Sequence, residues 1–177
     1  MAHDQIGIDW TDSGFQALLD PLGVSFIGGA VQLPFDLGSR GRAEVAAIGW
    51  ATVELDRAAA QLSAELGTTF EPAIRDALLG ATVRRSTGTE PPILIEEPDT
   101  EGRLSGALAK HGEGPIALYL RLAHLDQLPS QLSIRAGNGP LGPARLVLNG
   151  PPWGPFLILV GPAGPATGNA DRVPSQQ

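Results

Sequence analysis

One pattern, a strand and a helix followed by three strands, occurs twice in this chain and constrains its fold more than any other feature. The first copy opens with "VAAIGWATVEL" from Val45, which is typical of a buried strand. In "DRAAAQLSAELG", apolar residues then recur at helical spacing up to Gly67. Three extended segments follow, "TTFEPAI", "ALLGATVRRST" and "PPILIEE", and the same order recurs in shortened form from Pro115. The repeat predicts an α+β fold built from two tandem βαβββ modules.

The repeat also sets the expected boundaries of the regions. In "EGRLSGALAKHG" the apolar residues line one helix face and Gly112 ends it, so a linker helix is predicted before the second copy. After Gly161, "PAGPATGNADRVPSQQ" has almost no large apolar residue and is predicted to be disordered. We expect an N-terminal extension with a short strand or hairpin over 1–44, a domain over 45–162 and the tail over 163–177. Within the domain, module one spans about 45–98, the linker helix 99–113 and module two about 114–162.

Charge and composition disfavour several classes of partner. The chain has 12 basic and 19 acidic residues, a net charge of -7 and a pI near 4.8, so its field repels nucleic acid and anionic lipid. It has no cysteine, which excludes disulfides, thiolate metal sites and thiol nucleophiles. No apolar run approaches the roughly 18 residues that a membrane span needs. We therefore expect a soluble cytoplasmic protein whose partner is a small molecule rather than nucleic acid or a membrane.

Two longer segments connect the repeat to a known superfamily. The stretch "IGWATVELDRAAAQLSAELG" resembles the opening of a vicinal-oxygen-chelate module, the unit of glyoxalases, bleomycin-resistance proteins and methylmalonyl-CoA epimerases. The stretch "ILIEEPDTEGRLSGALAKHGEGPIALYLRL" is similar to the junction between the two modules of an epimerase-like protein, where "GEG" precedes the second module. The resemblance covers about residues 45–162. It implies a half-barrel sheet around a small-molecule site, and a homodimer.

The resemblance also locates a metal site and shows what has replaced it. In that family, the first and last strands of each module each contribute one inward-facing ligand, usually two histidines and two oxygen donors. The matching positions here are all apolar: Ala47, Leu94, Ala117 and Ile158. A register slip of one residue does not restore a ligand set, because the neighbouring residues are apolar too. We therefore expect neither a family-type metal nor another cofactor.

Strand alternation indicates which polar residues share the cavity with these positions. If Ala117 faces inward, Tyr119 and Arg121 do so as well, and Glu96 lies beside Leu94 on the same face. Burial raises the pKa of a carboxyl group and suits it to general-base work near neutrality. Glu96, Tyr119 and Arg121 are therefore the predicted catalytic residues. The predicted substrate-binding residues are Ala47, Leu94, Ala117, Ile158 and Trp153.

A purely structural alternative stays open for the same residues. Glu96 can pair with Arg121 as a buried or rim ion pair, while Tyr119 completes the core with its hydroxyl group hydrogen-bonded. Trp50 has the opposite parity to Ala47, which places it under a helix rather than in the cavity.

Several functions are compatible with this set of residues. The first hypothesis is a metal-independent isomerase, cyclase or lyase that acts on an apolar organic acid, thioester or polyketide-like substrate. The alternatives are a non-catalytic binder like the bleomycin-resistance proteins, an accessory subunit, and a metal-dependent epimerase or glyoxalase-like enzyme. The sequence does not decide whether the chain is an enzyme, because a fold alone does not specify a reaction.

Overall fold

The computed structural model describes residues 20–27, 30–33, 35, 43–99 and 101–162. The predicted tail over 163–177 and most of the predicted extension lie outside these residues. Within the described ranges, no helix is long and apolar enough to cross a membrane.

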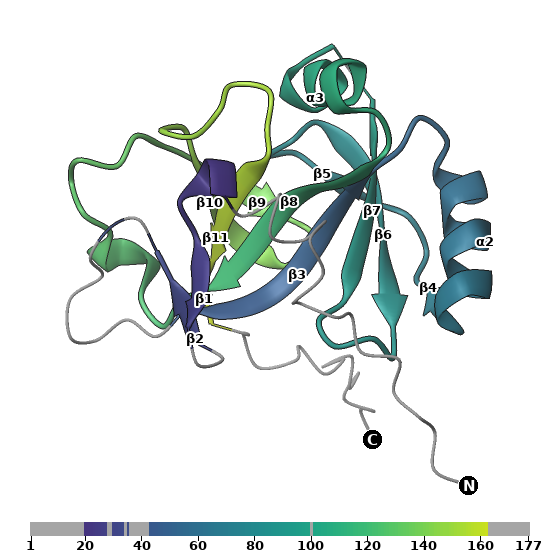
Figure 1. The fold of residues 1–177 in the computed structure, drawn as a ribbon, viewed down its shortest axis with the longest axis horizontal. Coiled ribbons are helices and arrows are strands. Elements are labelled where there is room, and N and C mark those ends of the chain that lie inside the picture. The colour runs from purple at the N-terminus through teal and green to yellow at the C-terminus, as the bar shows by residue number, and fades with distance from the viewer. Residues whose placement is uncertain (1–19, 28–29, 34, 36–42, 100, 163–177) are drawn as a thin grey trace, which may run out of the picture.

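A curled mixed sheet of nine strands forms the body of the molecule (Figure 1). Its strands are β3 (Glu44–Ala51), β4 (Thr69–Phe70), β5 (Ile74–Asp76), β6 (Ala81–Thr87), β7 (Ile93–Pro98), β8 (Gly114–Arg121), β9 (Ile134–Gly139), β10 (Gly142–Val147) and β11 (Phe156–Val160). Their order is β4-β6-β7-β3-β8-β11-β10-β9, and β5 pairs with β6 beside this path.

The two halves of the sheet repeat one another on either side of a central strand pair. In the first half β3 is parallel to β7, and β7 is antiparallel to β6. In the second half β8 is parallel to β11, and β11 is antiparallel to β10. The first strands of the two modules, β3 and β8, pair antiparallel at the centre. The predicted α+β fold of two tandem βαβββ modules is confirmed.

Helix α2 (Leu55–Leu66) covers the outer face of the first module (Figure 1). Its buried side chains pack against Ile93 and Ile95 of β7, with Trp50 of β3 in the same cluster, as the strand parity predicts. Gly67 ends the helix in the left-handed conformation (φ 61°), which a residue without a Cβ adopts freely. The second helix, α3 (Arg103–His111), contributes Leu104 and Ala107 to the cluster inside the curled sheet.

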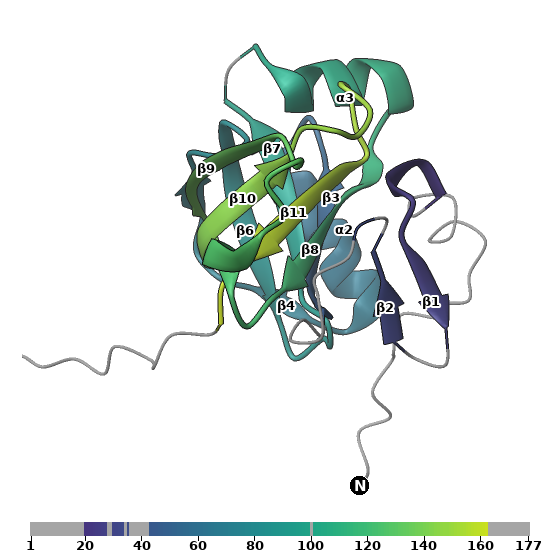
Figure 2. The same ribbon diagram turned by 90° about the vertical axis from the view of Figure 1, so that its left-hand side faces the viewer.

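The second module has only a short 3-10 turn, η2 (Leu125–Gln127), at the position that α2 occupies in the first. A segment from the N-terminal region covers its outer face instead: η1 (Asp20–Leu22), β1 (Ser25–Ile27) and β2 (Ala30–Gln32). β1 and β2 pair antiparallel and lie beside the main sheet (Figure 2). Leu22 and Val24 pack with outward-facing leucines of β8 and β11.

This packing makes the N-terminal segment part of the folded core. We expect Leu22→Ala to lower the free energy of unfolding by about 2 to 4 kcal/mol, because it removes a buried side chain from the second module's outer cluster. Val53→Ala, at a side chain that is 67% exposed, should change it by less than about 0.5 kcal/mol. Urea unfolding followed by tryptophan fluorescence measures both values. Equal stability of Leu22→Ala and the wild type would show that the segment contributes little to the core.

Candidate functional site

The concave side of the curled sheet holds an apolar core cluster, which we call the cup. The four positions that the resemblance matches to metal ligands, Ala47, Leu94, Ala117 and Ile158, are fully buried and share one core cluster. Their side chains carry only carbon, so they offer no donor atom. In the described part of the chain, no group of three or more His, Asp or Glu side chains is arranged to hold a metal. The residues present do not fit a family-type divalent metal.

Two of the predicted catalytic residues meet inside this cup. Glu96 on β7 and Tyr119 on β8 are both 0% exposed, and the Tyr119 hydroxyl group donates a hydrogen bond of 2.5 Å to Glu96 Oε1. Between them runs β3, where Gly49 makes room for the carboxyl group. A Cβ atom at Gly49 would lie 2.8 Å from Glu96 Oε1 and 2.7 Å from Ala117 Cβ. The missing side chain therefore lets the pair form across the middle strand.

The surroundings hold a proton on this pair at neutral pH. The pKa of Glu96 is raised to about 8, chiefly because the carboxyl group is buried; the hydrogen bond from Tyr119 opposes this rise, and the nearby carboxyl group of Asp76 adds to it. Burial and the carboxyl groups of Glu96 and Asp76 raise the pKa of Tyr119 well above its ordinary value. The second carboxyl oxygen of Glu96, Oε2, is buried without a hydrogen-bond partner. Near neutrality the site thus contains a carboxylic acid that can ionise with a small change of pH.

Asp76 is a second buried carboxyl group near Tyr119, and the sequence patterns did not predict it. It ends β5 with 0% exposure, and its Oδ1 accepts hydrogen bonds from the backbone N–H groups of Leu78 (2.7 Å) and Leu79 (3.3 Å). Burial raises its pKa, against the lowering effect of these two N–H groups and of Tyr119. In the sequence, Asp76 falls between two of the predicted extended segments. The available signal was an aspartate placed to accept from the N–H groups of the turn that follows it.

Two other predicted site residues, Arg121 and Trp153, lie away from the Glu96–Tyr119 pair. Arg121 pairs in register with Glu44, whereas Glu96 pairs with Ala51 at the opposite end of β3. Among the described residues no ion pair joins Arg121 to Glu96, so the alternative of a Glu96–Arg121 salt bridge is wrong. Trp153 is 46% exposed and packs over Gly106 of α3, outside the core cluster of the cup.

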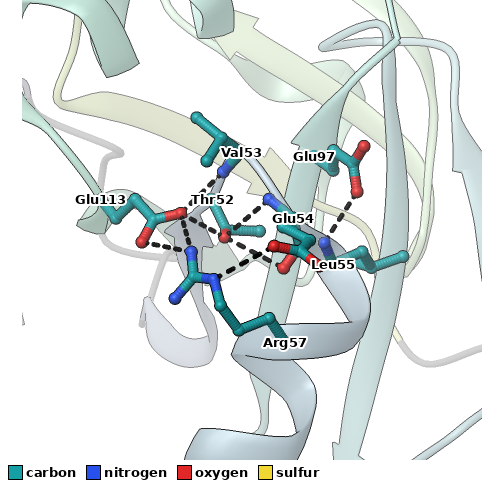
Figure 3. Close-up of polar contacts among 7 residues, drawn as sticks. All are labelled: Thr52, Val53, Glu54, Leu55, Arg57, Glu97 and Glu113. Carbon is teal, nitrogen blue, oxygen red and sulfur yellow. Dashed lines mark hydrogen bonds and ion pairs between the residues drawn. The ribbon is translucent and has the colours of Figure 1, made fainter.

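A second polar cluster ties the module junction to the start of α2 (Figure 3). Glu113, from the "GEG" motif, accepts hydrogen bonds from Thr52 Oγ1 (2.6 Å), the Val53 N–H (2.8 Å) and Arg57 Nη2 (2.5 Å). These bonds, led by that from Thr52, lower the pKa of Glu113 to about 2. Glu97 accepts a 2.7 Å hydrogen bond from the Leu55 N–H. The resemblance motif thus has a structural function in this chain.

A groove of about 410 Å³ lies on the outer face of the second module. It runs between the N-terminal segment and the outward side of β10 and β11, opposite the cup. Apolar side chains of Leu22, Phe35, Val147 and Leu157 and the carboxamides of Gln131 and Asn149 line it. Among the described residues of its lining, none has an ionisable side chain.

The buried acid predicts an alkaline loss of stability. The unfolded chain releases the Glu96 proton near pH 4.5, while the folded protein keeps it until about pH 8, so stability falls as pH rises between these values. In Glu96→Gln the amide still accepts from Tyr119 but cannot ionise. We expect a flatter stability profile over this range and a gain of about 1 to 3 kcal/mol at neutral pH. Urea unfolding at a series of pH values, with exposed Glu71→Gln as control, measures this; equal slopes for Glu96→Gln and the wild type would contradict it.

Glu113 predicts the opposite behaviour in acid. Its folded pKa lies below the ordinary value, so its contribution to stability is complete above about pH 4.5 and disappears as pH falls toward about 2. Glu113→Gln should be less stable than the wild type at pH 7 and should lose less stability between these two pH values. Thermal unfolding across the acid range checks the prediction, with exposed Glu90→Gln as control. A variant that follows the wild-type acid profile would show that the cluster in Figure 3 adds no stability.

Solved structures share this fold at low sequence identity. No family model matches the chain, and no curated protein matches it. The methylmalonyl-CoA epimerase of Mycobacterium tuberculosis is similar with a TM-score of 0.57 and 21% identity, over 68% of this chain and 88% of that one. A variant of the Streptomyces coelicolor epimerase in complex with 2-nitronate-propionyl-CoA gives 0.56 and 17%, over 68% and 97%. A hypothetical protein from Bacillus halodurans gives 0.58 and 12%, over 71% and 99%. The chain has the vicinal-oxygen-chelate fold, the fold of the methylmalonyl-CoA epimerases.

Proposed function

We propose that this chain is a metal-independent enzyme, an isomerase, cyclase or lyase, that moves a proton on a small organic acid or thioester. The observation that most supports this proposal is the Glu96–Tyr119 pair. In it, a fully buried carboxyl group with a pKa of about 8 is hydrogen-bonded to the chain's single tyrosine. A general base works best when its pKa is near the operating pH, and burial in an apolar cup supplies that shift.

The chemistry follows from the two groups. Ionised Glu96 accepts the proton from a carbon next to a carbonyl group, and the electron pair of the broken C–H bond moves onto the carbonyl oxygen. Tyr119, released from Glu96, donates its hydrogen bond to that oxygen, where the negative charge develops. Return of the proton at the same or another carbon completes an isomerisation, while loss of a leaving group from the next carbon completes a lyase reaction.

Two observations support the choice of substrate class and the absence of metal chemistry. Structures of methylmalonyl-CoA epimerases hold methylmalonyl-CoA or 2-nitronate-propionyl-CoA, and a thioester of this kind has an acidic C–H bond. The positions that would carry metal ligands here are alanine, leucine and isoleucine, which supports polarisation of the carbonyl group by protein hydrogen bonds. A homodimer stays a prediction, to be measured by light scattering.

A second candidate function, non-catalytic binding, is favoured by the outer groove. Its volume lies within the range of about 300 to 1,000 Å³ typical of small-molecule pockets. Its apolar side chains and two carboxamides suit an uncharged ligand with hydrogen-bonding groups at its edge. In that case the Glu96–Tyr119 pair has only a structural role in the core.

Deuterium exchange tests the proposal and separates the two candidates. Protein is incubated in D2O with methylmalonyl-CoA and a panel of apolar acids and thioesters, and mass spectrometry follows uptake next to the carbonyl group against a protein-free blank. We expect exchange by the wild type that rises with an apparent pKa near 8, and at least about a hundredfold loss in Glu96→Gln. Glu97→Gln is the matched control, because Glu97 caps α2 outside the cup and its amide retains the acceptor.

Each other outcome contradicts a stated part of the proposal. Equal exchange by Glu96→Gln and the wild type would remove Glu96 from the reaction. A compound that binds in native mass spectrometry while no compound exchanges would identify a binder. A stoichiometric divalent metal found by elemental analysis would overturn metal independence.

A further inference from the structure

The Glu96–Tyr119 pair is sealed from solvent, so any substrate needs a way in. The turn between β5 and β6, residues 77–80, closes one side of the cup. Its Leu78 is 2% exposed and belongs, with Leu79, to the same core cluster as Tyr119. On its other side, Leu78 lies against β9, because the sheet curls until β5 and β9 are in contact. We call residues 77–80 the door.

The door rests on a strip of β9 that lacks side chains. Gly137 and Gly139 occupy alternate positions of β9, so they face the same side of the sheet. A Cβ atom at Gly137 would lie 3.0 Å from Leu78 Cδ1, and one at Gly139 would lie 3.7 Å from Asp76 Oδ1. Glycine gives the turn a place to sit but offers no side chain to interlock with it. Moving the door away from β9 therefore separates no interlocked side chains at these two positions.

The hydrogen bonds of the door join it to Asp76, which precedes it, and to Asp99, whose N–H donates to the Gly80 carbonyl group at 3.0 Å. Asp76 Oδ1 binds the N–H groups of Leu78 and Leu79, and the Gly80 N–H donates to the Asp76 carbonyl group at 3.0 Å. Gly80 has a φ of 68°, which a residue without a Cβ adopts without strain. The turn and Asp76 can therefore move together about Gly80 while keeping the bonds between them. The second oxygen of Asp76, Oδ2, is buried without a hydrogen-bond partner, and opening would hydrate it.

We propose that residues 77–80 form a door that swings away from β9 to expose the Glu96–Tyr119 pair, with Asp76 holding the turn together as it moves. Its use as a substrate entrance rests on the proposed function, but the opening itself is a property of the fold. The two are tested separately.

A disulfide can lock the door in this chain. A Cβ atom at Gly137 would lie 3.7 Å from Leu78 Cβ, within the range of about 3.5 to 4.5 Å that disulfides require. Because the chain has no cysteine of its own, the double variant Leu78→Cys/Gly137→Cys contains two cysteines, which can pair only with each other within one molecule. Leu78→Ser/Gly137→Ser is the matched control, which cannot cross-link.

The chain's single tyrosine reports the opening without any assay of catalysis. N-acetylimidazole acetylates accessible tyrosine hydroxyl groups, and peptide mass spectrometry measures the modification at Tyr119 alone. We expect acetylation in the oxidised cysteine variant to be at least about tenfold slower than in the wild type and in the serine control. Dilute urea below the unfolding transition should leave the wild-type rate unchanged, because a local opening exposes little surface.

A second variant tests the same door without a cross-link. Gly137→Val places a side chain where Leu78 packs against β9 and should hold the door open. Tyr119 acetylation should therefore become faster than in the wild type. The proposal is overturned if the oxidised variant reacts at the wild-type rate, if Gly137→Val does not accelerate acetylation, or if the wild type reacts only through global unfolding. Locked protein should also lose deuterium exchange and regain it on reduction. Failure of exchange in every form, with acetylation behaving as expected, would reject the proposed function and leave the door intact.

Discussion

The antiparallel pairing of β3 with β8 is the interaction on which the rest of the structure depends. It joins the two modules, and its alternation sends Ala47 and Tyr119 into the cup while Ile48 and Leu118 face outward. Both faces of the pair are therefore apolar and both need a cover. The curled sheet encloses the inner face. Helix α2 and the N-terminal segment cover the outer face, each over one module.

The cup brings packing and chemistry into conflict at the same residues. A core filled by Leu94 and Ile158 excludes water, and this exclusion both shifts the proton affinity of Glu96 and makes its ionisation unfavourable. A leucine at position 96 would avoid the penalty and leave Tyr119 without its acceptor. Buried carboxyl groups with perturbed pKa values cluster at functional sites, where they are used in binding or catalysis. The unpartnered oxygens of Glu96 and Asp76 lie where such a use is expected.

The sequence predicts those features that depend on local periodicity. Strand parity was enough to place Trp50 outside and to put Glu96 and Tyr119 on one face, and the repeat was enough for the fold. Strand parity does not predict which residues of two neighbouring strands lie opposite each other. The β3–β8 register shifts between Val45 and Ala47 and between Gly49 and Trp50, so the separation of Arg121 from Glu96 could not be derived. The burial of Asp76 depends on β5 reaching β9, a contact between distant segments that no local pattern encodes.

The cover of the second module has a consequence for how the chain is made. Leu22 packs with Leu118, which follows it by 96 positions, whereas Leu62 of α2 packs with Ile93 only 31 positions later. During synthesis from the N-terminus, the first module can therefore cover its own outer face well before the second. The apolar side chains of Leu22 and Val24 therefore lack their packing partners until β8 and β11 have been synthesised. Contacts of such long sequence separation slow folding, and a waiting apolar segment favours aggregation. Completion of the second module is thus the step before which this chain is most exposed to aggregation.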